Sequence, residues 1–204
     1  MERVKAYVDG FNLYHGLKTR HGRKYLWPDL LALAVRLLKP SQHLVAVEYF
    51  TARVRNQAES GQRQAVYLDA LDAHCPLVKV VQGHFQKKTQ ECRSCGGQWV
   101  SYEEKETDVS IAVRLVADGV RGVFDTALLI SADSDLCPAV RELKWLDPGK
   151  RIIAVFPPRR HSEDLRRAAD GMVKINDVTV RNSQLPPLVV TATGITLTRL
   201  KHWT

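Results

Sequence analysis

The sequence predicts an α/β fold of three layers, in which helices cover both faces of a mostly parallel sheet. Short, almost continuously apolar segments alternate along the chain with segments of helical periodicity. The apolar segments lack the polar alternation of strands that have one face in water. They are therefore expected to be buried on both faces, as the strands of parallel sheets are.

The first half of the chain contains three of these expected strands. Residues 3–8 (RVKAYV) form an apolar run that ends abruptly at Asp9-Gly10, as expected for a strand that delivers an acid at its carboxyl end. A polar turn and a helical segment follow. The further elements are a helix from Pro28 that Lys39-Pro40 stops, a strand at 44–52, a helix at 60–73 with Val66, Leu68 and Leu71 near its apolar face, and a strand at 77–82.

The second half repeats the alternation. Thr107 is expected to cap a helix (DVSIAVRLVADG) whose apolar face consists of Val109, Ala112, Val113 and Val116. A strand at 126–131 leads to Ala132-Asp133-Ser134-Asp135, and a helix runs from there to about Trp145. The last elements are a strand at 151–156 stopped by Pro157-Pro158, a polar helix at 161–169, a short strand at 173–176, and a tail from Pro186 that fits either an extra strand pair or a mobile arm.

Residues 84–102 interrupt this pattern and are expected to form an inserted loop or hairpin. The segment contains Cys92-Arg-Ser-Cys95-Gly-Gly, which has the spacing and the glycines of a zinc knuckle. A tetrahedral site needs two more ligands, and the candidates are His84, Cys75, His74 or a pair from a second subunit. The alternative is a reduced loop without metal. Cys137 is expected to be a small core residue.

Composition narrows the class of protein. The 204 residues fit one domain with an insertion, and the net charge of +8 with a pI of about 9.5 favours an anionic partner, most commonly nucleic acid. The chain shows no apolar run of the signal-peptide or membrane-spanning type, so a cytoplasmic protein with reduced cysteines is expected. A basic protein that gathers aspartates at strand ends is expected to hold a cation on a surface that attracts phosphate.

Two of these aspartates follow the carboxyl ends of expected strands, the place where parallel sheets carry their active sites. Asp9 and Asp133 each follow an apolar strand, and ligands bind beyond the carboxyl ends of such strands. For a single aspartate, a turn-forming or capping role is as good an explanation. Asp133 and Asp135 together favour a site for Mg²⁺ or Mn²⁺, which prefer oxygen ligands and keep water molecules that can be activated.

Three segments carry a resemblance to a known family. They are YVDGFNLYHGLK at 7–18, EEKETDVSIAVRLV at 103–116 and LLISADSDLCPAVREL at 128–143. They resemble the motifs of the NYN domain, which belongs to the PIN-like nuclease superfamily and includes bacterial LabA/DUF88-like proteins. The resemblance covers about residues 3–180. It implies a PIN-like domain at 1–182, which includes the Cys-containing insertion, and a C-terminal tail at 183–204.

The resemblance also implies roles for particular residues. Metal binding is implied for Asp9, Asp108 and Asp133, and for Asp135 as a fourth acid that alternatively orders its loop. Asn12 is implied as a polar helper, and Ser131, Ser134 and Lys105 as residues that shape the site or contact phosphate. Family members are thought to act on RNA, so the expectation is a metal-dependent ribonuclease, most simply an endoribonuclease, in which Asp9, Asp108, Asp133, Asp135 and Asn12 are catalytic.

Other residues are candidates for the same surface. The bland interpretation of Glu103, Glu104 and Glu106 is a solvated acidic turn, and the sharper one is an additional metal ligand. Basic residues that follow strands are candidates for contact with the RNA backbone, and aromatic residues are candidates for stacking on unpaired bases of single-stranded RNA. They are Arg53, Arg55, Lys87, Lys88, Arg159, Arg160 and His161, and Tyr14, His15, Trp99 and Tyr102. For any single one of them, a solvated surface residue or a core aromatic is the better explanation.

Two alternatives to a ribonuclease remain at the level of sequence. A non-catalytic RNA-binding or regulatory module would keep the same fold, although it has no reason to retain carboxylates that repel phosphate. A phosphatase is disfavoured, because strand one ends in Asp9-Gly10-Phe11-Asn12 and lacks the Asp-x-Asp expected of a haloacid-dehalogenase-type nucleophile. The oligomeric state is open, and a homodimer is one expectation.

Overall fold

The computed structural model describes residues 1–52, 58–92 and 94–199, and the side chains at 58, 84–88 and 99–105 are excluded from the description. The strands are β1 (Glu2–Asp9), β2 (Gln42–Ala52), β3 (Val78–Glu91), β4 (Gln98–Lys105), β5 (Thr126–Ile130), β6 (Arg151–Phe156), β7 (Gly171–Lys174), β8 (Leu188–Val190) and β9 (Thr196–Thr198). The helices are α1 (Gly10–His21), α2 (Leu30–Val35), α3 (Ala58–His74), α4 (Thr107–Val120), α5 (Cys137–Leu146), α6 (Glu163–Ala168), α7 (Asp177–Arg181) and the 3-10 turn η1 (Ser134–Leu136).

The main sheet confirms the predicted α/β class. Its strand order is β4-β3-β2-β1-β5-β6-β7, and all neighbours pair in parallel except β3 and β4. The chain builds outward from β1 through β2 to β3 and later returns to the other side of β1 with β5. The point where the strand order reverses, between β1 and β5, is where sheets of this kind bind ligands.

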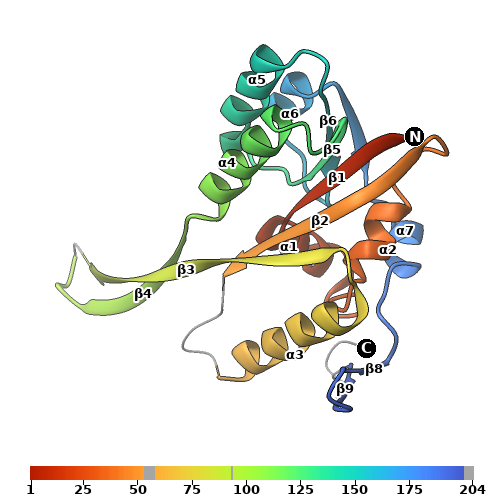
Figure 1. The fold of residues 1–204 in the computed structure, drawn as a ribbon. Helices are drawn as coiled ribbons and strands as arrows, with labels where there is room; N and C mark the ends of the chain where they lie inside the picture. The colour runs from red at the N-terminus through yellow and green to blue at the C-terminus, as the bar shows by residue number, and fades with distance from the viewer. Residues whose placement is uncertain (53–57, 93, 200–204) are drawn as a thin grey trace.

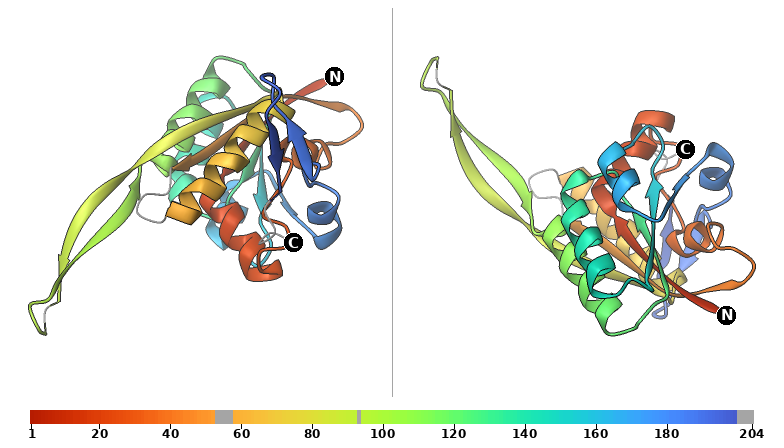
Figure 2. Two further views of the ribbon diagram at one scale, coloured as in Figure 1. Left: turned by 90° about the horizontal axis from the view of Figure 1, so that it is seen from below. Right: turned by 90° about the horizontal axis from the view of Figure 1, so that it is seen from above.

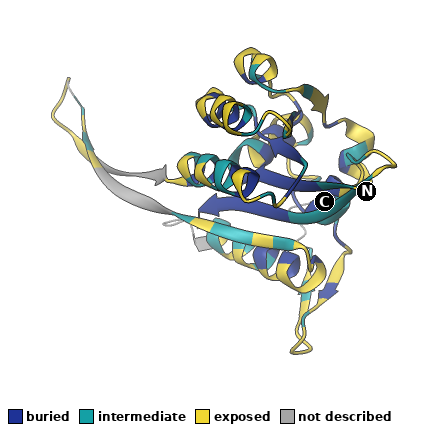
Figure 3. Cartoon of the chain, turned by 45° about the horizontal axis from the view of Figure 1, so that its top comes forward, coloured by how far each residue is buried: buried dark blue, intermediate teal, exposed yellow. Residues whose placement is uncertain are grey.

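Helices cover both faces of this sheet, so the structure has the predicted three layers (Figure 1). One hydrophobic core lies between the sheet and α1, α2 and α3, and the other lies between the sheet and α4, α5 and α6. Successive residues of β1 alternate between the two, with Val4, Ala6 and Val8 in the first and Tyr7 in the second. The central strands are buried on both faces and the helices expose their outer sides (Figure 3).

Helix α4 differs from the sequence prediction in two respects. Val109 and Val113, expected on its apolar face, are 64% and 63% exposed, and the buried stripe contains Ile111, Leu115 and Asp118. Ala112 and Val116, the other two residues of the predicted face, are partly buried against the same core, so the prediction was wrong at Val109 and Val113 only. The buried stripe also includes a charged residue, Asp118, which Lys5 neutralises. Thr107 is not the N-cap either.

The residue that precedes Thr107 begins this helix instead. Glu106 is the N-cap, with a left-handed backbone (φ 79°), and Thr107 is buried as the first helical residue. A non-glycine residue in this conformation is uncommon and costs about 1–2 kcal/mol. The turn into α4 is therefore held by the surrounding structure rather than by a side-chain cap.

The inserted segment is a hairpin, one of the two forms expected. Strand β3 runs past the sheet, well beyond the predicted end at residue 82, and pairs with β4 from His84 opposite Lys105 to Glu91 opposite Gln98. The hairpin projects from the body of the molecule, as the two further views show (Figure 2). The Cys92–Cys95 loop lies at its far end.

The C-terminal tail forms a strand pair rather than a free arm up to Arg199, the last described residue. Strands β8 and β9 pair antiparallel, Val189 is buried in the core on the α1–α3 side, and Trp27 Nε1 donates to the carbonyl of Pro186 at 2.9 Å. Among the described helices, none is long and apolar enough to cross a membrane.

Candidate active site at the ends of β1 and β5

The site begins at the junction of β1 and α1, where the helix follows the strand without the predicted polar turn. Asp9 is 2% exposed and serves as the N-cap of α1, because its Oδ1 accepts from the backbone N–H of Asn12 at 3.0 Å. The side-chain amide of Asn12 donates to Oδ2 at 2.6 Å. Asn12, which the resemblance implies as a polar helper near the metal or substrate, thus contacts Asp9 through both its backbone and its side chain.

Gly10 allows this tight junction. A Cβ atom at this position would lie 2.6 Å from the backbone oxygen of Phe50 and 2.9 Å from the ring of Tyr49. These distances are shorter than real Cβ contacts, and the nearest atom belongs to the backbone of the neighbouring strand. Any side chain here would push α1 away from β2 and would turn Asp9 with it.

Ser131 connects the ends of β1 and β5. Its hydroxyl is fully buried, donates to Oδ2 of Asp9 at 2.8 Å and accepts from the backbone N–H of Asp133 at 3.1 Å. The Asp133 carboxylate in turn accepts from the backbone N–H of Asp135 at 2.9 Å and caps η1. One hydroxyl thus fixes the carboxylate of Asp9 and the backbone of Asp133 relative to each other.

Asp108 approaches the same edge of the sheet from α4. Near the other end of this helix, Asp118 contacts Lys5 of β1 at 2.6 Å. The rise along the helix axis from Asp118 back to Asp108 is about 15 Å, and the rise along β1 from Lys5 to Asp9 is about 13 Å. The first turn of α4 and the carboxyl end of β1 therefore lie at a similar height, with Asp108 half-buried.

A buried charge network sets this arrangement of α4 and β1. The ammonium group of Lys5 bonds Asp118 and also Glu48 of β2 at 3.1 Å, and the hydroxyl of Tyr7 donates to Asp118 at 2.9 Å. Lys5, Glu48 and Asp118 are each 5% exposed. Burial and the nearby Asp118 raise the pKa of Tyr7 far above its usual range, so this hydroxyl stays a donor.

The oxygen donors at this edge suit a hard divalent cation. Among the described residues, no group of three or more His, Cys, Asp or Glu side chains lies close enough together to hold a metal ion. Mg²⁺ does not require such a group, since it keeps several waters and takes one or two carboxylates plus substrate phosphate. Each carboxylate oxygen has two lone pairs. Asp9 Oδ1 accepts one bond in the structure, from Asn12, which leaves it the capacity for a cation.

The remaining predicted site residues are less tightly placed. Ser134 and Asp135 are exposed on η1 beside Asp133, as a role toward substrate requires. The side chains of Lys105, Glu103, Glu104, Lys87, Lys88, Trp99 and Tyr102, and the whole of Arg53 and Arg55, lie outside the described residues. Of the residues after β6, His161 packs against Phe156 with ring centroids 4.6 Å apart.

The structure rules out two of the zinc ligands proposed for the cysteine loop. Cys75 is buried at the end of α3, where its thiol bonds Asp29 at 3.4 Å, and His74 lies 3.6 Å from the same carboxylate. Burial first, and then the charge of Asp29, raise the pKa of Cys75 to about 12. Both residues precede β3, whereas the cysteine loop lies beyond its far end, so neither can reach it.

The described residues of the cysteine loop form a tight turn. Backbone hydrogen bonds join Cys92 to Gly97 at 2.8 Å and Gly96 to Cys92 at 2.9 Å, and Gly96 adopts a positive φ of 68°. Hydrogen bonds from the backbone of Ser94 and Cys95 lower the pKa of the Cys92 thiol. His84, in the strand eight residues earlier, lies about 27 Å away along the extended backbone. Cys137 is buried, as expected.

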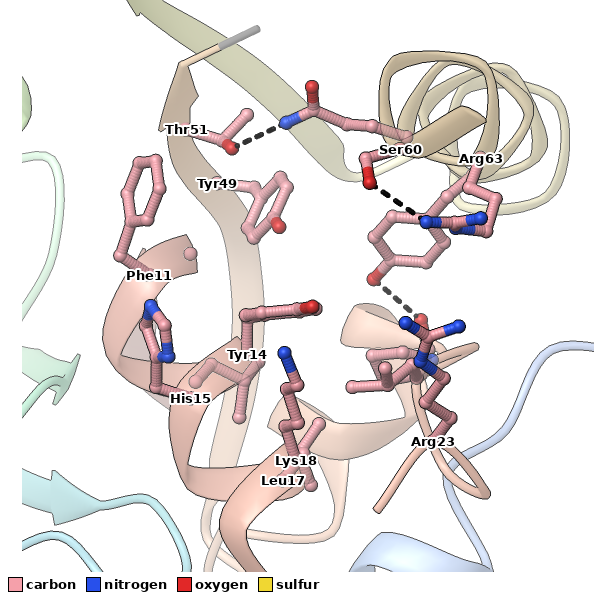
Figure 4. A pocket seen from close by; sticks show the side chains of 16 residues that line it. Phe11, Tyr14, His15, Leu17, Lys18, Arg23, Tyr49, Thr51, Ser60 and Arg63 are labelled. Carbon is pink, nitrogen blue, oxygen red and sulfur yellow. Dashed lines mark hydrogen bonds between the residues drawn. The ribbon is translucent and has the colours of Figure 1, made fainter. Parts of the chain in front are cut away.

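A cavity of about 440 Å³, which no sequence pattern predicted, lies between α1, β2 and α3. Its wall includes Gly10, the ring of Tyr49 and His15 (Figure 4). Burial, followed by the charges of Arg160 and Lys18, lowers the pKa of His15, so its imidazole is favoured in the neutral form. Gly10, which follows Asp9 directly, lines the cavity, so the cavity lies next to the predicted active site.

The reversal of strand order, the acids at the ends of β1 and β5 and the helices on both faces define a PIN-like α/β domain. A family model described as "NYN domain" matches residues 3–176, so the chain belongs to the NYN family and thereby to the PIN-like nuclease superfamily. This confirms the resemblance that three sequence segments suggested. The matched range contains each of the predicted aspartates.

Two similar proteins extend this comparison. The chain is 27% identical over 177 residues to 6-hydroxy-3-succinoylpyridine 3-monooxygenase HspA of Pseudomonas putida, an alignment that covers 70% of this chain and 55% of that protein. The chain thus spans about half the length of that relative. A crystal structure of a protein of unknown function from Vibrio parahaemolyticus is similar with a TM-score of 0.54 and 19% identity, and the match covers 90% of this chain and 96% of that one. This second likeness shows the fold alone.

Proposed function

We propose that this protein is a metal-dependent endoribonuclease that hydrolyses phosphodiester bonds of single-stranded RNA. The observation that supports this most is the Ser131 hydroxyl, which connects the carboxylate of Asp9 to the backbone of Asp133 where the strand order reverses. Family membership and the net charge of +8 point to the same class of substrate.

The roles of the residues follow from this geometry. Asp9 and Asp133, with Asp108 from α4 and Asp135 from η1, would hold Mg²⁺ or Mn²⁺, which when bound supplies an activated water and neutralises charge on the phosphodiester. Asn12 and Ser131 hold the Asp9 carboxylate from two sides, so its side chain would lose little conformational entropy when it binds the cation. Ser134 and Lys105 would contact phosphate.

An RNA cleavage assay tests the proposal. Asp133→Asn keeps the size of the side chain and an oxygen that caps η1, but it removes the charge. We expect it to lower the cleavage rate on the order of 100-fold or more, since even residues that only support metal ligands cost 10–100-fold. Asp72→Asn, an exposed position on α3, serves as the matched control and should cut RNA as fast as the parent.

The assay should use single- and double-stranded RNA and DNA, with Mg²⁺, Mn²⁺ or EDTA. Equal cleavage by the parent and Asp133→Asn would refute the proposal. Absence of cleavage in every metal, combined with RNA affinity that EDTA does not change, would favour a non-catalytic RNA-binding module.

A second candidate function comes from the cavity and the named relative. HspA is named as a monooxygenase of a pyridine derivative. The cavity beside Asp9 has aromatic and basic side chains in its wall, which suits a heteroaromatic acid. In this case the chain would bind 6-hydroxy-3-succinoylpyridine and would not cut RNA. Calorimetric titration with that compound, beside the cleavage assay, separates the two functions.

A further inference from the structure

The cavity beside Asp9 has a lining with an unusual balance of chemistry. Four aromatic rings contribute to it, together with three permanent cations and several hydroxyl and amide groups. Among the described residues no Asp or Glu lines it. The aromatic and cationic members are Phe11, Tyr14, Tyr49 and Tyr67, and Lys18, Arg23 and Arg63.

The cations reach the cavity from three separate segments of the chain. Lys18 comes from α1, Arg23 from the connection after α1 and Arg63 from α3, and their charged groups surround one opening (Figure 4). Only 15% of the Arg63 side chain is exposed, and its guanidinium bonds Ser60 at 2.8 Å. Its carboxylate contact, Glu59 at 3.3 Å, is 90% exposed and gives it little compensation. Three cations held together without a lining carboxylate favour an anion.

The aromatic side chains form a rigid wall. The Tyr67 hydroxyl donates to the carbonyl of Pro28 at 2.9 Å, and the Tyr49 and Tyr67 rings meet edge-on with centroids 6.2 Å apart. Tyr14 is different, since it is 40% exposed at the mouth and its ring contacts His15. An exposed ring beside a fixed aromatic wall can stack on a flat ligand without reorganisation of the core.

We propose that this cavity binds one nucleotide of single-stranded RNA, with the base among the aromatic side chains and the phosphate at Arg63, Lys18 and Arg23. This inference rests on the proposed ribonuclease function and names where the substrate is held. Gly10, which follows Asp9 directly, lines the cavity, so the phosphodiester next to a nucleotide bound there would extend toward the acids. A nucleotide bound in the cavity would fix which phosphodiester of the RNA lies at the acids, which the acids alone cannot do.

The cavity would recognise a flat heteroaromatic ring that carries an anionic group. A nucleotide has both features, and so does a free heteroaromatic acid. The test therefore uses two probes, adenosine 5′-monophosphate and nicotinate, each titrated calorimetrically into the protein in EDTA. We expect saturable binding of the nucleotide. Arg63→Gln and Tyr14→Ala should each weaken it about tenfold, as expected for one charge-assisted hydrogen bond or one stacked base.

Arg121→Gln is the matched control, because Arg121 is exposed at the end of α4 on the opposite face of the sheet. It should bind the nucleotide as the parent does. No saturable nucleotide binding, or binding that Arg63→Gln and Tyr14→Ala leave unchanged, would overturn the proposal. Binding of nicotinate alone, with the same dependence on Arg63, would also overturn it in favour of a small acid.

The titration and the cleavage assay test the two proposals separately, so either proposal can be refuted while the other stands. Since EDTA prevents metal-dependent cleavage, nucleotide binding is measured whether or not the protein cuts RNA. RNA cleavage without nucleotide binding would refute the proposed nucleotide site in the cavity and would leave the proposed ribonuclease function standing. Nucleotide binding without cleavage in any metal would support the cavity as an RNA-binding site and refute the ribonuclease. In an active protein, Arg63→Gln should raise the KM for a short RNA more than it lowers kcat.

Discussion

Replacement of Lys5 by methionine should destabilise the protein strongly. The ammonium group of Lys5 bonds both Glu48 and Asp118, and all three side chains lie in the core between β1, β2 and α4. Methionine retains most of the packing of the aliphatic stem. The loss is therefore mainly electrostatic, since two carboxylates remain in the core without their shared cation.

The expected magnitude follows from burial. Removal of one partner from a buried ion pair costs about 3–5 kcal/mol, because the remaining charge is neither solvated nor paired. Arg114, 3.4 Å from Glu48 and 39% exposed, gives partial compensation, which places the expectation at the lower end of this range. For a protein of this size, a loss of about 3 kcal/mol corresponds to a fall in Tm of about 6–12 °C.

Urea unfolding at pH 7, followed by circular dichroism, measures this change. Lys144→Met is a matched control, since Lys144 forms an ion pair of similar length with Asp170, 2.7 Å, but is 35% exposed. Exposed pairs contribute about 0–1 kcal/mol, so the control should differ little from the parent. If Lys5→Met also loses less than about 1 kcal/mol, the account of the buried network is wrong.

A double variant isolates the cause. Asp118→Asn removes one of the two carboxylates and keeps an acceptor for the Tyr7 hydroxyl. We expect it to destabilise the parent but to cost much less, or nothing, in the Lys5→Met background. Strictly additive losses would mean that Lys5 and Asp118 are not energetically coupled.

Three further predictions concern the junction, the acid limb and the cysteine loop. Gly10→Ala should cost about 1–3 kcal/mol in urea unfolding through overpacking against Phe50, and unchanged stability would contradict the close approach. Hydrogen bonds from Arg3 hold the pKa of Asp125 below its usual value. Asp125→Asn should therefore be less stable than the parent above about pH 4, and the difference in stability should shrink as the pH falls through the lowered pKa. A difference that stays constant from pH 6 to pH 2 would contradict this. We propose that Cys92 and Cys95 supply half of a tetrahedral zinc site that a second subunit completes. Zn²⁺ should then dimerise the protein in sedimentation experiments, and Cys95→Ser should remain monomeric under the same conditions; dimerisation of that variant would exclude the loop.

The strands were predictable from the sequence because burial on both faces leaves almost no freedom of residue type. Residues 3–8, 126–131 and 151–156 are mostly apolar for that reason, and β1, β5 and β6 lie there. Lys5 is a buried exception, whose charge Glu48 and Asp118 neutralise. The position of acids at strand ends then placed Asp9 and Asp133 at one edge. These inferences needed only local pattern and the general rule for parallel sheets.

Features that depend on contacts between distant segments were not predictable in this way. The buried stripe of α4 includes Asp118, whose burial makes sense only beside Lys5, more than a hundred residues earlier. The cavity is formed by α1, β2 and α3, and no single segment shows it. One signal was present: Phe11, Tyr14 and Lys18 recur at helical spacing along α1, which gives one face both rings and charge.

The hydrogen bond between Ser131 and Asp9 joins residues 122 positions apart. Neither half of the chain contains a site by itself, because β5 completes it only after docking beside β1. Contacts so distant in sequence form against a large loss of chain entropy, so they form late and slowly. Recovery of the proposed RNA cleavage during refolding should therefore lag behind recovery of the helical signal, and this activity would report the final assembly of the sheet.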